Sequence, residues 1–189
     1  MITTVLAAAD RVAMPWKNGG GVTREIAAWP VGSGLEDFDW RISMAEVRKP
    51  GAFSLFPDVD RVLTVLEGRL ALTFAGEKLL VLGATSEPLS FPGDRPCWGE
   101  PVGKAVLDLN VMVRRGGFRC QVERVSNTQW RPTGDVAVLI ALEPLSVVEQ
   151  VASDSRSLGT FDGLFCTLVP AHARFQVGGC ALGVSISAK

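Results

Sequence analysis

The chain has 189 residues, of which 47% are hydrophobic and 21% charged, and its formal net charge is −1 at pH 7. This balance is typical of a globular protein and excludes extended disorder. Because there is no surplus of positive charge to neutralise phosphates, the composition also argues against nucleic-acid binding.

Hydrophobic residues alternate with a period of two along most of the chain, which predicts an all-β protein with many short strands. Three glycines at 19–21 form a turn before the first clear strand. Glu67-Gly68 is a two-residue turn signal, which predicts that the flanking strands form a hairpin. The predicted strands span residues 22–29, 38–47, 53–56, 61–66, 69–74, 79–82, 89–91, 105–115, 118–125, 135–142, 160–169 and 176–187.

The N-terminus and the cysteines indicate a compartment. Residues 2–9 are apolar, but no basic residue precedes them, so they do not have the layout of a signal peptide. No run approaches the ~18 apolar residues that a membrane span needs. None of the four cysteines lies in a CxxC pair, which is typical of reduced, buried thiols. We therefore expect a cytoplasmic protein.

The chain length corresponds to about 1.3 typical domains. A polar joint lies at 126–134, and the tetrapeptide Glu-Pro-Leu-Ser occurs twice, at 87–90 and at 143–146. Together with the number of strands, these features favour two stacked β-barrel halves within a single domain, 1–189. The expected halves are 12–125 and 126–189, and the N-terminal segment is available to complete the second barrel.

His172 is the only histidine. Zinc and iron sites of the usual kind need two or three imidazoles or clustered thiolates, and a Ser-His-Asp or Cys-His site would need His172 itself as the base. No nucleophile motif lies beside it, so we interpret His172 as a surface or structural residue. We expect no metal and no other cofactor.

The first group of candidate binding residues surrounds the three glycines. Trp16 offers a flat apolar wall, Lys17 could meet a carboxylate, and Asn18 can both donate and accept hydrogen bonds. Thr23 and Glu25 follow on one strand face. Glycine would let the backbone approach a ligand closely. The alternative is a loop that covers a barrel end and leaves Lys17 in water.

Two other strands carry polar side chains on one face. Arg41 and Ser43 share a face, and inside a barrel such an arginine would bind a carboxylate. Asp108, Asn110 and Met112 share a face of another strand, and this mixed lining suits a small-molecule cavity. In both cases the alternative is a face in contact with water.

The segment 53–61 supplies two further candidates. Phe56 is either a core residue or the wall of a pocket, and Arg61 follows five positions later.

Several stretches of this chain resemble the HutD/Ves family over nearly the whole length: WKNGGGVTREI (16–26), FDWRISMAEV (38–47), FSLFPDVDRVLTVLEG (53–68), FPGD (91–94) and DLNVMVRR (108–115). The resemblance implies a bicupin, two cupin-like antiparallel β-barrels in one chain, in the bacterial cytoplasm. Some members are encoded with histidine-degradation enzymes, and a role in controlling that pathway is proposed for them. No enzymatic reaction is firmly attached to the family. Metal-binding cupins carry a His-x-His pattern that this chain lacks, which agrees with a metal-free protein.

The candidate binding residues are those that match the family's motifs, and the barrel interpretation predicts that they cluster around one cavity: Trp16, Lys17, Asn18, Thr23, Glu25, Arg41, Ser43, Phe56, Arg61, Asp108, Asn110 and Met112. The chain departs from the expected pattern at Asp58, because a glycine is expected next to Pro57. This difference affects the turn that aims Arg61.

These observations lead us to expect a metal-free protein that binds a small carboxylate such as urocanate or formylglutamate. Lys17 and either Arg41 or Arg61 would neutralise the carboxylate. The alternatives are a cofactor-free isomerase or hydrolase, with Glu25 or Asp108 as general base, and a surface interaction module. We expect neither nucleic acid nor a membrane as a partner. A homodimer is compatible with the sequence.

Overall fold

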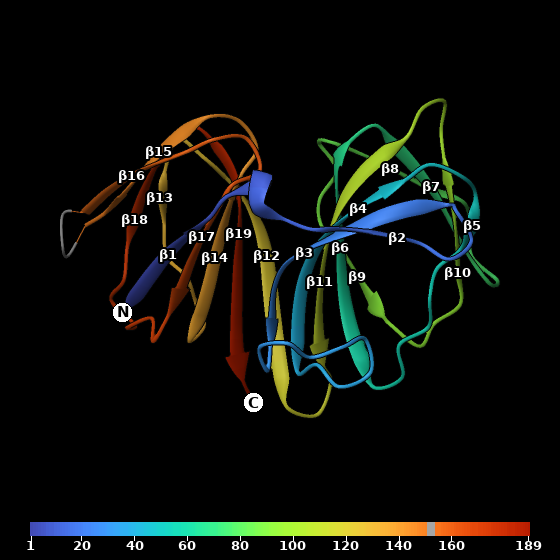
Figure 1. The fold of residues 1–189 in the computed structure, drawn as a ribbon, viewed down its shortest axis with the longest axis horizontal. Coiled ribbons are helices and arrows are strands. Elements are labelled where there is room, and N and C mark those ends of the chain that lie inside the picture. The colour runs from blue at the N-terminus through green and yellow to red at the C-terminus, as the bar shows by residue number, and fades with distance from the viewer. Residues whose placement is uncertain (151–153) are drawn as a thin grey trace. The chain divides into compact units, whose positions relative to one another are not determined.

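The computed structural model describes residues 1–150 and 154–189. In this part of the chain, the only helical element is the short 3-10 turn η1 (Ala8–Asp10). No helix among the described residues is long and apolar enough to cross a membrane. The chain forms two compact units (Figure 1): the first consists of Val12–Gly117, and the second of Met1–Arg11 together with Phe118–Lys189.

The first unit contains a six-stranded and a four-stranded antiparallel sheet. Side chains from both sheets, such as Leu63 and Leu72, form one buried core. The six-stranded sheet consists, in spatial order, of β2 (Ala13–Pro15), β3 (Gly21–Trp29), β4 (Trp40–Val47), β11 (Val106–Arg114), β6 (Val59–Glu67) and β9 (Leu89–Pro92). The smaller sheet consists of β5 (Gly51–Ala52), β10 (Cys97–Pro101), β7 (Arg69–Phe74) and β8 (Leu80–Gly83).

The second unit has a five-stranded and a four-stranded sheet around a core that includes Leu139, Leu164 and Phe175. The larger sheet consists of β1 (Ile2–Leu6), β17 (Gly163–Thr167), β14 (Val136–Ala141), β19 (Cys180–Ala188) and β12 (Phe118–Ser126). The smaller sheet consists of β13 (Gln129–Trp130), β18 (Phe175–Gly178), β15 (Leu145–Glu149) and β16 (Asp154–Leu158). The N-terminal strand β1 pairs with β17 and thus belongs to this unit.

The units divide earlier in the chain than the polar joint suggests. β12, which the sequence assigns to the first half, pairs with β19 along its whole length, from Phe118↔Ala188 to Ser126↔Cys180. The division therefore falls at Gly117, before β12, and not after residue 125. The reason is that strand pairing, not the polarity of a connecting loop, decides which unit a strand joins.

The turn at Gly68 does not form the hairpin that Glu67-Gly68 predicts. β6 pairs with β11 and β9, whereas β7 pairs with β10 and β8, so the two strands lie in different sheets. Gly68 has a φ of 81°, a conformation that glycine adopts without strain. The chain uses it to turn the corner from one sheet to the other.

Two other predictions from the pattern are also wrong. Residues 53–56 form no strand, and 176–187 is divided into β18 and β19 by Gly179, with a φ of 136°. The first copy of the repeated tetrapeptide leads into β9 of the six-stranded sheet, and the second copy leads into β15 of a four-stranded sheet.

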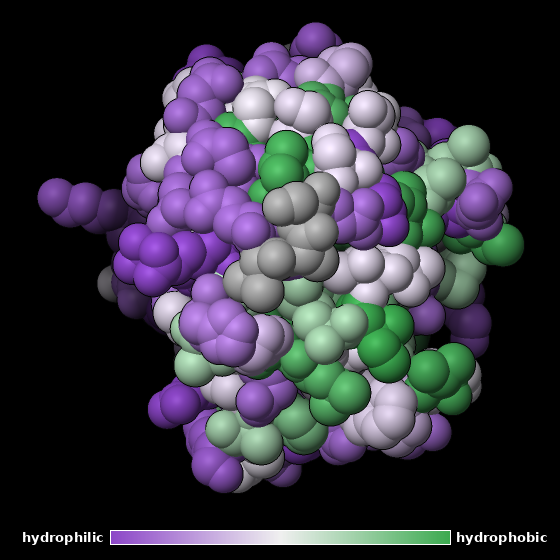
Figure 2. All heavy atoms as spheres, turned by 90° about the vertical axis from the view of Figure 1, so that its left-hand side faces the viewer, coloured by the Kyte–Doolittle hydropathy of each residue, from purple (hydrophilic) through white to green (hydrophobic). Residues whose placement is uncertain are grey.

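All four cysteines are free thiols, and Cys97 and Cys166 are buried while the other two are half-buried. One face of the second unit, shown in Figure 2, carries both hydrophilic and hydrophobic groups of residues. The exposed large hydrophobic side chains described in this unit are Met1, Ile2, Val5 and Leu168. β1 is the edge strand of the larger sheet and carries Ile2 and Val5. Leu168 lies near them, because it follows Thr167, which pairs with Ile2.

Candidate functional site

The candidate residues of the first unit meet on one face of its larger sheet, with β11 at the centre. In the register of β11, Asn110 lies opposite Ser43 of β4, and Met112 lies opposite both Arg41 of β4 and Arg61 of β6. Directly opposed residues share a face. Each of these side chains is less than a tenth exposed: Arg41, Ser43, Arg61, Asp108, Asn110 and Met112. The face is therefore polar and buried at once.

A chain of hydrogen bonds joins three of these side chains. The Nε and Nη2 atoms of Arg61 both donate to Asn110 Oδ1, at 2.8 and 2.5 Å. Asn110 Nδ2 in turn donates to Asp108 Oδ1. The rings of Phe53 and Phe91 lie over the guanidinium, with centroids 4.8 and 5.5 Å from Arg61 Cζ. Arg61 is thus held between aromatic rings and an amide oxygen.

Burial shifts the pKa values of the two ionisable side chains at the ends of this hydrogen-bonded series. Burial raises the pKa of Asp108 to about 7, against the opposing effects of Arg61 and of the hydrogen bond from Asn110. Burial also lowers the pKa of Arg61 to about 10, with Asp108 and Cys97 opposing it. At neutral pH the guanidinium therefore remains charged, while the carboxyl group lies close to its midpoint.

A second polar pair lies at the more exposed end of the same face. Arg41 Nε donates to Glu25 Oε2 at 2.8 Å, and Arg41 Nη1 donates to Ser43 Oγ at 3.4 Å. The Arg41 side chain is 5% exposed and that of Glu25 is 37% exposed, so Glu25 remains hydrated. In the described part of the chain, Arg41 Nη2 and Arg61 Nη1 donate to no oxygen, which leaves both guanidiniums able to bind an anion.

The glycine-rich loop contributes Trp16 and Thr23 to this face but leaves its other two candidates outside. Trp16 Nε1 donates to Thr23 Oγ1 at 2.8 Å, and the Trp16 ring packs against the buried core. Asn18 Oδ1 accepts from the backbone N–H of Gly20 at 2.9 Å, so this side chain closes the turn. Lys17 lies exposed in the same turn.

The glycines of this loop serve packing within the protein. A Cβ on Gly21 would lie 2.4 Å from the carbonyl oxygen of Glu46 and 3.0 Å from the Trp16 ring. Gly19 has a φ of 65°, which the turn requires. The close backbone approach that the three glycines predict is therefore an approach to β4 and to Trp16.

The Gly21→Ala variant is expected to lose about 1–3 kcal/mol of unfolding free energy, because β3 and β4 must separate to admit the methyl group. Urea denaturation measures this loss. Gly51→Ala is the matched control, since a Cβ there meets nothing within 4 Å. Equal midpoints for the two variants would show that Gly21 is not tightly packed.

Phe56 and Met112 belong to an apolar cluster with Phe38 and Val59. The rings of Phe38 and Phe56 meet edge to face, with centroids 6.2 Å apart. Phe56 and Met112 therefore pack against apolar side chains, whereas Arg61, Asn110 and Asp108 are joined by hydrogen bonds.

Sequence reasoning missed the two rings that cover Arg61. Phe91 lies directly opposite Arg61 in the pairing of β9 with β6. Phe53 packs so closely on β10 that a Cβ on Gly99 would meet its ring at 2.3 Å. The FPGD stretch was the available signal for Phe91, and Phe53 begins the 53–61 segment, from which only Phe56 and Arg61 were chosen as candidates.

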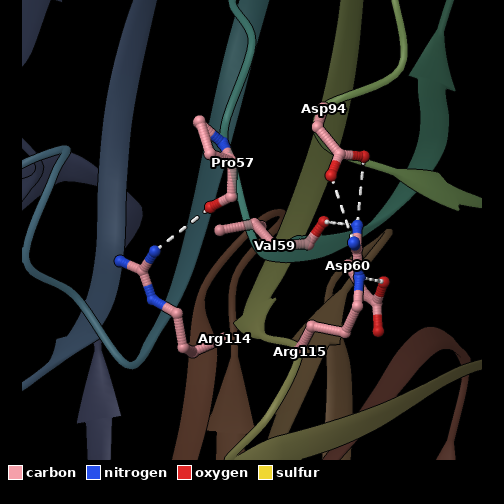
Figure 3. A network of polar contacts seen from close by, with 6 residues as sticks. All are labelled: Pro57, Val59, Asp60, Asp94, Arg114 and Arg115. Atoms are coloured by element: carbon pink, nitrogen blue, oxygen red, sulfur yellow. Dashed lines mark hydrogen bonds and ion pairs between the residues drawn. The ribbon is translucent and has the colours of Figure 1, made fainter.

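A further network of charges fixes the loop before Arg61 (Figure 3). Arg115 Nε donates to Asp60 Oδ1 at 2.9 Å, and its Nη1 and Nη2 atoms each donate to an Asp94 oxygen at 3.1 Å. Arg114 Nη1 donates to the carbonyl oxygen of Pro57 at 3.2 Å. Asp58 has a φ of 57°, so the turn after Pro57 adopts the left-handed conformation without a glycine.

His172 is exposed in the segment between β17 and β18, far in sequence from these residues. Among the residues that the structure describes, no three His, Cys, Asp or Glu side chains are grouped as metal ligands would be.

Comparison with known proteins gives a consistent set of relatives. The HutD family model matches residues 8–181. The chain is 32% identical to an uncharacterized 21.2 kDa protein in the hutC 3′ region of Pseudomonas putida, over 85% of this chain and 84% of the relative. It is 37% identical to Protein Ves of Cronobacter sakazakii, over 60% of this chain and 61% of that protein.

Solved structures agree with these matches. HutD from Pseudomonas fluorescens SBW25 superposes with a TM-score of 0.87 and 28% identity over 100% of both chains. Oxalate decarboxylase from Bacillus subtilis superposes with a TM-score of 0.61 at 9% identity, over 96% of this chain and 76% of that one. The second likeness concerns the cupin fold alone.

Proposed function

This chain belongs to the HutD family, and on that basis we propose that it is a metal-free binding protein for small carboxylate metabolites that serves the control of histidine utilisation. The pathway is suggested by the relative in the hutC 3′ region of Pseudomonas putida. The observation that carries the proposal is the buried inner face of the first unit, on which Arg41 and Arg61 flank Met112.

The two guanidiniums supply the chemistry that a carboxylate needs. Each is less than a tenth exposed, and each keeps N–H groups that no described oxygen accepts. Charge-assisted hydrogen bonds from a guanidinium are about twice as strong as neutral ones. Ser43 and Asn110 lie beside them and orient a polar ligand, while Trp16 and Phe91 offer flat apolar surfaces.

A ligand would approach from the edge where Glu25 lies. The Glu25 side chain is 37% exposed, and it accepts a hydrogen bond from Arg41, whose own side chain is buried. A carboxylate that binds there competes with Glu25 for Arg41. The single carboxylate of urocanate and either of the two carboxylates of formylglutamate match the planar fork of an arginine.

Thermal unfolding with urocanate, formylglutamate, histidine and glutamate tests the proposal. A ligand present at 100 times its Kd should add about 2.7 kcal/mol to the unfolding free energy. Arg41→Ala should abolish this gain. Arg24→Ala is the control, because Arg24 lies on the same strand as Glu25 but is 38% exposed and contacts Glu46. A gain that survives in Arg41→Ala would show that the ligand binds elsewhere.

A further inference from the structure

Asp108 carries a buried oxygen that no donor reaches. The side chain is 1% exposed, and its Oδ1 accepts a hydrogen bond from Asn110 Nδ2. Its Oδ2 has no hydrogen-bond partner among the described residues. A buried polar atom without a partner usually costs about 1–3 kcal/mol. A bound molecule that brings a donor to Oδ2 would remove that cost.

The other carboxylate on this face does not share this property. Glu25 accepts from Arg41 Nε at 2.8 Å, and 37% of its side chain is exposed to water. Glu25 is therefore satisfied before any ligand arrives. Of the two candidate carboxylates, Glu25 and Asp108, only Asp108 has a buried oxygen that accepts no hydrogen bond from the described residues.

We propose that Asp108 selects, among small carboxylates, those that also carry an N–H donor, which its Oδ2 accepts. The inference rests on the proposed function, because it takes the carboxylate of the same ligand to lie at the guanidiniums beside Asn110. Asp108 and Asn110 are two positions apart on β11, so their Cα atoms are about 7 Å apart along the strand. A donor about four bonds from the carboxylate spans this separation.

The charge on Asp108 sets the conditions of the test. Burial raises the pKa of Asp108 to about 7, and Arg61 is the charged group that opposes this rise. At pH 8 the carboxylate is mostly ionised and can only accept hydrogen bonds. Binding is therefore best measured at pH 8, where an N–H donor of the ligand has an acceptor to meet.

Two ligands that differ in a single group make the experiment sharp. 4-Acetamidobutanoate has an N–H four bonds from its carboxylate carbon, and 4-acetoxybutanoate has an ester oxygen in the same place. Titration calorimetry at pH 8 should give a Kd that is about 5- to 150-fold lower for the amide than for the ester. The ester has no N–H to donate to Oδ2, and its own oxygen is an acceptor that would face the lone pairs of Oδ2.

The Asp108→Asn variant should lose this preference or reverse it. Asn110 Nδ2 holds an acceptor at the Oδ1 position, so the new amide presents its N–H₂ where Oδ2 was. Asp60→Asn is the matched control, because Asp60 is also on the first unit's larger sheet but pairs with Arg115. Circular dichroism and urea midpoints of both variants show whether they fold.

The outcomes distinguish the selectivity of Asp108 from the binding of carboxylates as such. Equal affinity for the amide and the ester, or a preference that persists in Asp108→Asn, would overturn the inference, and the proposed function would stand if urocanate or formylglutamate still binds. If none of these carboxylates binds the wild-type protein, both the proposed function and the inference fail.

Discussion

The Arg61→Ala variant is expected to lose about 3–5 kcal/mol of unfolding free energy, because it removes a large buried side chain together with the hydrogen bonds that this side chain donates. The change leaves Asn110 Oδ1 without its two donors and Asp108 without its neighbouring cation. It also opens a void between the rings of Phe53 and Phe91. Urea denaturation at pH 7 measures the loss.

A surface arginine and a double variant make this result specific. Arg24→Ala should change the unfolding free energy by no more than about 0.5 kcal/mol, because the side chain is 38% exposed. Combining Arg61→Ala with Asp108→Asn should recover part of the loss, since the second change removes the unpaired carboxylate. Arg61 and Asp108 are not coupled if Arg61→Ala lowers the unfolding free energy by less than about 1 kcal/mol. The same conclusion follows if the effects of Arg61→Ala and Asp108→Asn on the unfolding free energy simply add in the double variant.

The alternation of residues predicts the strand faces of this site well. It places Arg41 with Ser43, and Asp108 with Asn110 and Met112, and the register of β4 and β11 agrees. A period of two is a local property of an extended chain, so it survives whatever the strand pairs with. It cannot show that both faces of β11 are buried, as Leu109 and Asn110 both are.

The partners of the site could not be predicted, because they depend on contacts between distant strands. Arg61 and Asn110 are 49 residues apart, and only the pairing of β6 with β11 brings them together. Gly68 shows the same limit: a turn signal is the same for a hairpin and for a corner between sheets, and the neighbouring strands decide. Family resemblance supplied residue types at this site but no contacts.

The stability of the protein is expected to fall as pH rises from about 4 to 7, and Asp108 is expected to cause much of that fall. Its pKa is about 7 when folded and about 3.9 when unfolded. In this window the folded state therefore holds a proton that the unfolded state has lost, so raising the pH favours unfolding. The difference of about three pKa units corresponds to about 4 kcal/mol, present below pH 4 and lost above pH 7.

Asp108→Asn isolates this contribution, because the amide has nearly the same shape and does not titrate. Relative to the wild type, the variant should gain about 4 kcal/mol between pH 4 and pH 8, as measured by urea denaturation across that range. Glu36→Gln, at an exposed carboxylate, is the control for the same loss of one negative charge. Parallel curves for Asp108→Asn and the wild type would mean that Asp108 titrates at an ordinary pKa, and that its burial beside Arg61 is fully compensated.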